Sequence, residues 1–208
     1  MKMKNKSLFL LCLILSISSL VQAQVNAYYM LADGNNHWND TSKWFVVGSP
    51  SYPLNDLPDK TINVSMNYDS VSAGTTNLSL LGDNIECSNL TLTSYASSSG
   101  DFKLVVDTIN TFGNIMIGTN TGITGNGKKA SLIVRDDCSM LHDSYNIYNP
   151  FPIDVNIDVD SGELSFDSNQ DSCVIMGAIF VGNGKVSIPA NFTLSAENIT
   201  FDDDPSVD

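Results

Sequence analysis

The chain has 208 residues, and its 23 acidic residues outnumber its ten basic ones. This acidic balance disfavours nucleic acid and anionic membrane surfaces as partners, because they repel a chain of like charge, whereas it attracts cations such as Ca²⁺. Scattered carboxylates also keep a β protein soluble and its strand edges unpaired, and we take this as the main role of the charge.

Residues 1–23 have the features of a signal peptide. Lysines at positions 2, 4 and 6 precede an apolar run from Leu8 to Leu20, and the segment ends in Val21-Gln22-Ala23. The run is shorter than the ~20 residues that a bilayer-spanning helix needs. We therefore expect cleavage before Gln24, with Ala27 ending a second candidate site, and a secreted or outer-cell-surface protein without a membrane span. Without residues 1–23, seven basic and 23 acidic residues give a net charge of −16.

The cysteines form neither a disulfide framework nor a metal motif. After removal of Cys12 with the signal peptide, Cys87, Cys138 and Cys173 remain, an odd number that cannot all pair within one chain. Their separations of 51 and 35 residues fit no zinc motif. One disulfide plus a free thiol, and three buried thiols on inward strand positions, both fit the sequence.

Residues 24–60 are expected to form an irregular amino-terminal cap. They contain both tryptophans, Trp38 and Trp44, and three of the seven prolines. Proline lacks the N–H donor of a β ladder, so we expect no run of central strands here. The two indole rings are expected to plug the end of a hydrophobic core.

Residues 61–201 are expected to form short β-strands. Apolar residues alternate with polar ones, which indicates strands with one buried face, and turn residues such as Gly182-Asn183-Gly184 follow most runs. No helix longer than one or two turns is expected. The alternating apolar positions are, in chain order, Ile62, Val64, Met66, Leu78, Leu80, Leu90, Leu92, Leu104, Val106, Ile115, Ile117, Leu132, Val134, Ile153, Val155, Ile157, Val159, Leu164, Phe166, Ile179, Val181, Val186, Ile188, Phe192, Leu194, Ile199 and Phe201.

Matching runs recur at a loose period, 25 residues from Leu90 to Ile115 and 20 from Ile179 to Ile199. Periods in the twenties favour a β-solenoid in which each coil supplies two or three strands and the apolar residues stack into an interior column. An antiparallel β-sandwich would contain similar strands, so the spacing alone leaves both folds open.

The segment before the strands carries a recognisable order of residues. It contains His37-Trp38-Asn39-Asp40-Thr41-Ser42-Lys43-Trp44, then Gly48, Pro53 and Asp56, and then the strand from Ile62 to Met66. This order resembles the opening of bacterial secreted parallel β-helix proteins and autotransporter-like adhesins. The motif spans about thirty residues of this chain, and its proline element occurs twice, at Pro53 and at Pro58.

The resemblance implies a right-handed parallel β-helix over residues 61–201, capped by residues 24–60 and followed by an acidic tail at 202–208. It also implies a surface or adhesin-like structural module without catalytic activity, with an extracellular polysaccharide or a surface protein as its partner. The chain is then either a shortened member or the front of a longer surface protein.

A carbohydrate-active β-helix, such as a polysaccharide lyase or hydrolase or a carbohydrate-binding module, is the alternative. The densest acidic stretch holds carboxylates that could do acid and base work on a glycosidic bond or bind Ca²⁺. Against this, Gly162 falls one residue late for a Ca²⁺ loop, and alternating acids are typical of the solvent face of a strand. The acidic residues are Asp154, Asp158, Asp160, Glu163 and Asp167.

Basic partners for such an acidic site are scarce, since the mature chain has one arginine, Arg135, and two histidines, His37 and His142. No nucleophile, phosphate-binding or zinc-protease motif occurs. We therefore name no catalytic, cofactor-binding or metal-binding residue and no cofactor, with Ca²⁺ lacking a specific motif.

Two further patterns have ordinary structural explanations. A Pro-punctuated aromatic insert, Tyr145, Tyr148 and Phe151, could stack on a sugar but more often such an insert covers the side of a coil. Asn-x-Ser/Thr triplets fit turn chemistry in a chain rich in these residues, and they begin at Asn39, Asn63, Asn77, Asn89, Asn191 and Asn198.

Overall fold

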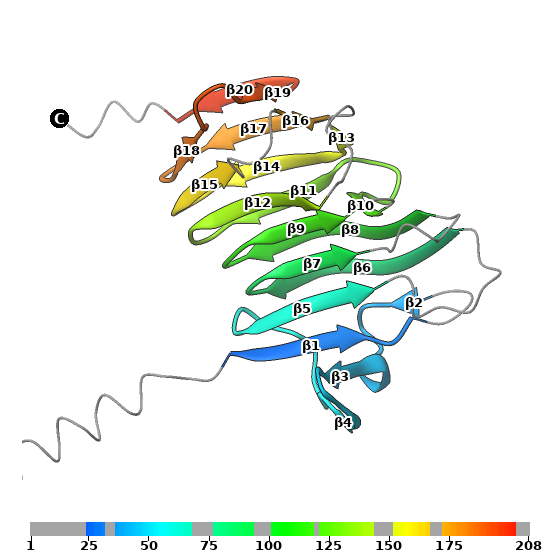
Figure 1. Ribbon diagram of the computed structural model, residues 1–208. Coiled ribbons are helices and arrows are strands. Elements are labelled where there is room, and N and C mark those ends of the chain that lie inside the picture. The colour runs from blue at the N-terminus through cyan, green and yellow to red at the C-terminus, as the bar shows by residue number, and fades with distance from the viewer. Residues whose placement is uncertain are drawn as a thin grey trace, which may run out of the picture.

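The chain winds into a parallel β-helix, seen from the side in Figure 1. The computed structural model describes residues 24–31, 36–67, 77–93, 101–118, 121–143, 152–166 and 172–202. The expected signal peptide, the aromatic insert at Tyr145, Tyr148 and Phe151, and Asp167 lie outside these residues. Among the described helices, none is long and apolar enough to cross a bilayer.

Three sheets form the walls of the β-helix. The first sheet contains, in spatial order, β18 (Lys185–Ser187), β15 (Glu163–Phe166), β12 (Cys138–Asp143), β9 (Ile115–Gly118), β7 (Leu90–Thr93), β5 (Ile62–Asn67), β1 (Val25–Tyr29), β3 (Trp44–Val46) and β4 (Ser49–Pro53). The second contains β2 (Asn36–His37), β6 (Asn77–Cys87), β8 (Asp101–Thr111), β11 (Ala130–Val134), β14 (Val155–Val159), β17 (Ala178–Val181) and β20 (Asn198–Phe201), with β10 (Thr121–Thr124) also paired to β8. The third contains β13 (Pro152–Ile153), β16 (Ser172–Ile175) and β19 (Thr193–Ser195).

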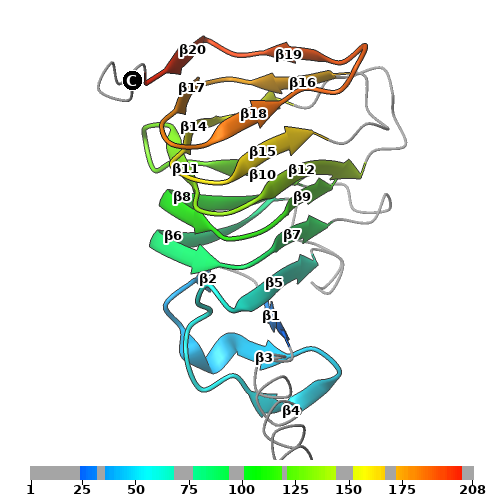
Figure 2. The same cartoon turned by 90° about the vertical axis from the view of Figure 1, so that its left-hand side faces the viewer.

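Successive strands visit the sheets in turn, so that β12, β13, β14 and β15 complete one coil and start the next. In Figure 1 the strands of the first sheet run from left to right at the front while the chain rises, and Figure 2 places the second sheet behind them. The coil is therefore right-handed, the hand that right-twisted strands favour in parallel crossover connections.

Inward positions stack directly on one another from coil to coil. Val64 pairs with Leu90, which pairs with Ile115, which pairs with Met140. All four side chains are buried, so the period-two alternation of the sequence becomes a continuous apolar column. Because the ladders between coils are parallel, the antiparallel sandwich is excluded and the predicted β-helix is confirmed.

The amino-terminal segment is more regular than predicted. β1 pairs in parallel with β5, so the first solenoid strand begins at Val25, within the segment that was expected to be irregular. β3 then pairs antiparallel with β1, and β4 antiparallel with β3, which closes this end of the stack. The two prolines of β4 are tolerated because β4 is an edge strand, which leaves some N–H groups unpaired.

Trp38 and Trp44 are buried under this closure, as predicted. Their rings lie edge to face at 4.6 Å, and Tyr29 lies edge to face with Trp44 at 5.0 Å. The Trp44 indole N–H donates to the Trp38 carbonyl oxygen at 2.8 Å. Gly82 stands at an inward position, where an added Cβ would lie 3.1 Å from Cβ of Trp38, so the glycine leaves room for the indole.

Two strand predictions need correction. The run from Ile153 to Val159 is two strands on different sheets, because the chain turns a corner at Asp154 between β13 and β14. Ile188 lies just beyond β18 and is exposed rather than inward.

The sequence left open whether the cysteines form one disulfide plus a free thiol or three buried thiols, and the structure shows three buried thiols. Cys87, Cys138 and Cys173 are all buried and free. Burial raises the pKa of Cys87 and Cys138 to about 12 each, and that of Cys173 to about 11. The three thiols therefore fill core positions as small apolar side chains.

Candidate functional site

The acidic stretch singled out in the sequence does not converge into one site in the described residues. Asp154 accepts a hydrogen bond from Thr124 Oγ1 at 3.3 Å, at the corner between two strands. Glu163 lies on β15, in the first sheet, and its Oε2 lies 2.7 Å from Lys185 Nζ. Each carboxylate thus bonds to a neighbouring coil.

Arg135 lies on the corner after β11 and joins three coils. Its Nε donates to Asn110 Oδ1 at 3.1 Å, and its Nη1 lies 2.5 Å from Asp160 Oδ2. Burial raises the pKa of nearby Asp158, the adjacent Asp160 raises it further, and Arg135 opposes both. This arginine acts as a clamp between successive turns of the chain.

Asparagine side chains from successive coils bond to one another in a stack, which was not predicted from the sequence. Asn63 Nδ2 donates to Asn26 Oδ1 at 2.7 Å, and Asn89 Nδ2 donates to Asn63 Oδ1 at 2.6 Å. The stack continues because the backbone N–H of Asn114 donates to Asn89 Oδ1 at 2.6 Å and that of Ser139 to Asn114 Oδ1 at 2.9 Å. The spacings of 26 and 25 residues between Asn63, Asn89 and Asn114 were the available signal.

A cleft of ≈ 500 Å³ opens on the outer side of the second sheet, next to the cap. Its lining combines three carboxylates, an imidazole and two amides with a floor of glycine and two aliphatic side chains. The lining residues are His37, Asn39, Asp40, Leu81, Gly82, Asp83, Val105, Asp107 and Asn126.

The floor of the cleft arises from a shared bend in the two longest strands. In β6 and β8 the inward alternation shifts at Asp83 and Asp107, which occupy equivalent places because Gly82 pairs with Val106 and Asn84 with Thr108 on either side. Neighbouring strands lie about 4.7–4.9 Å apart, so the bend sets two carboxylates one above the other. Leu81 lies next to Val105 on the outer face just before the bend.

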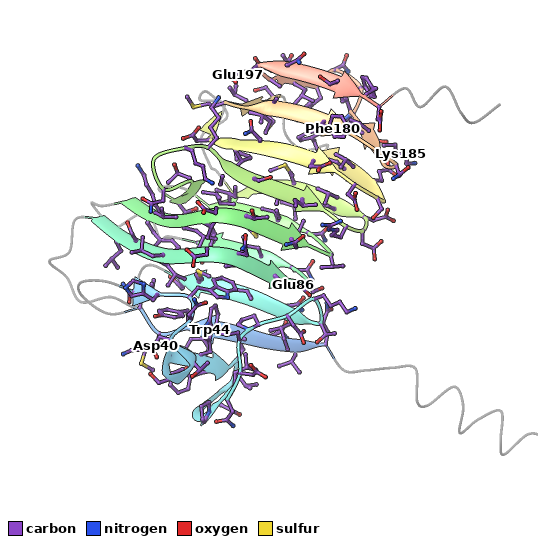
Figure 3. All side chains as sticks on the ribbon, turned by 180° about the vertical axis from the view of Figure 1, so that it is seen from behind. Asp40, Trp44, Glu86, Phe180, Lys185 and Glu197 are labelled. Atoms are coloured by element: carbon purple, nitrogen blue, oxygen red, sulfur yellow. The ribbon has the colours of Figure 1, made fainter. Side chains whose placement is uncertain are left out.

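The lower wall belongs to the cap. The backbone N–H of Trp38 donates to the Leu81 carbonyl oxygen at 2.7 Å, which ties the loop after β2 to β6. Tyr29 Oη donates to the His37 carbonyl oxygen at 3.0 Å and holds the strand that presents the imidazole. Ser42, whose Oγ donates to Asp40 Oδ1 at 2.5 Å, is the main cause of the lowered pKa of Asp40. Figure 3 labels Asp40 and Trp44, both at this end of the β-helix.

The upper wall is the turn between β10 and β11, which contributes Asn126. Lys128 of the same turn lies 3.6 Å from Asp107 Oδ1, with both side chains largely exposed. An exposed pair of this kind stabilises the fold little and can open readily. The cleft therefore presents acceptors and amide groups suited to hydroxyl or ammonium groups, above an apolar floor.

The basic residues named from the sequence are distributed differently. His37 lines the cleft, whereas Arg135 lies on the corner after β11. The side chain of His142 is outside the described residues. Within the described part of the chain, no group of three or more His, Cys, Asp or Glu side chains is arranged to hold a metal ion.

Comparison of the chain with protein-family models, with curated proteins and with solved structures finds no match.

Proposed function

We propose that the protein is an exported, non-catalytic structural module, an adhesin-like β-helix displayed or released at the cell surface. The observation that carries this proposal is the use made of the charged side chains, which bond along the stack rather than around a common point. Arg135 with Asp160, Lys185 with Glu163, and Lys129 with Glu197 each join different coils. These ion pairs connect coils along the axis of the β-helix, so the charged side chains belong to its wall rather than to a common reaction centre.

The amino-terminal features support export. A signal peptide at residues 1–23 would send the chain to an oxidising compartment, and burial of the three free thiols protects them from pairing there. We expect the protein recovered from the medium or the cell surface of an exporting host to begin at Gln24. Retention of residues 1–23 on recovered protein would contradict export by this route.

The proposed structural function is tested by asking whether the protein adheres to a surface without converting any polysaccharide on it. Beads coated with residues 24–208 should attach to surfaces carrying extracellular polysaccharide or surface protein, and the soluble module should release no reducing ends or unsaturated sugars from the same polysaccharides. Measurable turnover that is lost in Asp158→Asn, with the fold intact by circular dichroism, would replace this proposal by an enzymatic one.

The cleft supports a second candidate function, carbohydrate binding. Sugar hydroxyl groups can be met by its carboxylates and amides, and the C–H face of a sugar ring by Leu81 and Val105. Its acidic lining disfavours acidic polysaccharides and favours neutral or amino-sugar polymers.

Calorimetric titration with neutral and amino-sugar oligosaccharides tests this candidate. Binding should be lost in the double variant Asp83→Asn with Asp107→Asn and kept in Asp158→Asn, which alters the same sheet outside the cleft. Equal loss in both variants, or binding untouched by the double variant, would exclude the cleft as the sugar site.

A further inference from the structure

The end of the β-helix formed by β18, β19 and β20 leaves its inward side chains uncovered in the described part of the chain. Ile199 and Phe201 pair with Ile179 and Val181, which are core residues of the coil below. Yet Ile199 is 39% exposed and Phe201 60% exposed. Figures 1 and 2 show β19 and β20 at the top of the stack. These are core positions with one side missing.

The same end also carries three strand edges. β18, β20 and β19 are the terminal strands of the first, second and third sheets, respectively. Terminal strands present backbone N–H and C=O groups to any partner that supplies another strand. The occupant that fits must therefore offer strand edges around an apolar centre, as the end of another β-helix does.

Within the described residues, the charged side chains of the last coil are paired with lower coils. The last coil contains Lys185 and Glu197, and both bind to lower coils, Lys185 to Glu163 and Glu197 to Lys129. Figure 3 shows Lys185 and Glu197 on opposite sides of the upper coils. Asp202, just after β20, is an exposed acidic residue that borders the end, and Asp203 and Asp204 follow it in the sequence.

The opposite end has a different structure. There β3 lies antiparallel on β1, and Trp44 is fully buried beneath the closure. The terminal strands there are β4, which contains two prolines, and the two-residue β2, so head-to-tail stacking would meet short or proline-interrupted edges. The carboxy-terminal end of a second copy is the better match, because it repeats the same three strand edges around an apolar centre.

We propose that two copies of this chain dock through their β18–β20 ends, related by a two-fold axis perpendicular to the β-helix axis. That operation keeps the right-handed winding and reverses the strand direction, so facing strands run antiparallel. The contact is self-complementary and closes as a dimer rather than extending into a fibre. The coil from 182 to 201 supplies 20 residues, the lower bound of the ~20–30 residues a side of stable interfaces.

The net charge sets the salt dependence of this dimer. Each mature copy carries −16, so two copies repel each other at long range while the docking surface itself is apolar. Added salt screens this repulsion. We expect the dimer to strengthen as ionic strength rises, the opposite of an interface held by ion pairs.

Sedimentation velocity of residues 24–208, from low micromolar to submillimolar concentration and at low and high salt, tests the proposal. Phe201→Glu should raise the dimer Kd by at least about 30-fold, as expected for a central contact. Val47→Glu is the matched control, because Val47 is 50% exposed at the capped end, and it should dimerise like the parent chain. A monomer at all concentrations and salts, or equal loss in both variants, would overturn the proposal.

Hydrogen exchange gives a second readout that does not depend on a variant. Dimer formation should slow amide exchange in β18–β20 and leave β3 and β4 unchanged. Concentration-dependent protection confined to the cap or to the outer faces of the sheets would place the contact elsewhere and refute the proposed interface.

Discussion

Replacement of Gly162 by alanine tests whether successive coils touch as closely as described at the turn before β15. Gly162 has φ +76°, and an added Cβ would lie 2.5 Å from the carbonyl carbon of Asp136 and 2.7 Å from the backbone nitrogen of Asp137, one coil below. Gly127 is a matched control, since it also has φ +76° but its added Cβ would meet nothing within 4 Å.

Both substitutions lower the free energy of unfolding through backbone strain, and only Gly162→Ala lowers it further through a steric clash. Both place an L-residue in the left-handed region, which costs about 1–2 kcal/mol. Reduced freedom of the unfolded chain offsets about 0.4–1 kcal/mol of that. Gly162→Ala must also move backbone by about 0.9 Å to restore an ordinary 3.4 Å contact, and forced expansion of a packed region costs about 1–3 kcal/mol. Gly162→Ala should therefore be less stable than Gly127→Ala by about 1–3 kcal/mol.

Thermal unfolding followed by far-ultraviolet circular dichroism measures this difference. For a chain of this size, about 1–3 kcal/mol corresponds to a midpoint lower by about 2–12 °C. Urea unfolding at fixed temperature provides the free energy, with the slopes compared to confirm that both variants unfold the same surface. Free energies of unfolding that agree within about 0.5 kcal/mol between the two variants would refute the close approach of Gly162 to the coil below.

Four further predictions concern other parts of the stack. Trp44→Ala should destabilise the protein by about 3–5 kcal/mol through loss of its buried ring, and a loss below about 1 kcal/mol in urea unfolding would contradict its role in the core. Asn89→Ala removes two hydrogen bonds of the asparagine stack and should cost about 2 kcal/mol in the same assay, with no loss counting against the stack. All three buried thiols should resist a disulfide reagent in the native protein and react in denaturant, because burial raises the pKa of Cys87 to about 12; fast native reaction would contradict their placement. Hydrogen bonds from Thr61 lower the pKa of Asp59, so its contribution to stability is present above the unfolded pKa of about 3.9 and lost as pH falls through the folded value; Asp59→Asn should flatten acid unfolding in that range, and identical acid profiles would exclude this contribution.

The sequence predicted the walls of the β-helix well because each strand has one buried face. Inward positions such as Leu90 and Ile115 can be recognised because apolar and polar residues alternate around them. The spacing between these two paired residues equals the length of one coil. The cap was harder. Val25–Tyr29 has the sequence VNAYY, which is too short for alternation alone to identify a strand, and only its pairing with β5 reveals it as the first strand of the solenoid.

The candidate cleft could not be predicted from local patterns. Asp83 and Asp107 are 24 residues apart, and each reads as an ordinary polar residue in a turn-rich chain. Their adjacency depends on the register of β6 with β8, and the wall that carries Asp40 depends on how the cap folds back. Asp158 and Asp160 are close together in the sequence, yet Asp160 forms an ion pair with Arg135 of another coil and belongs to no common site.

Both tryptophans lie in the capped end, and this has a consequence for spectroscopy. Indole fluorescence reports on the surroundings of Trp38 and Trp44 alone, whereas circular dichroism reports on every coil. In a stack whose coils contact only their neighbours, unfolding can begin at one end and travel. A fluorescence transition later than the loss of β signal would mean that the chain unzips from the β20 end, and an earlier one that the cap opens first.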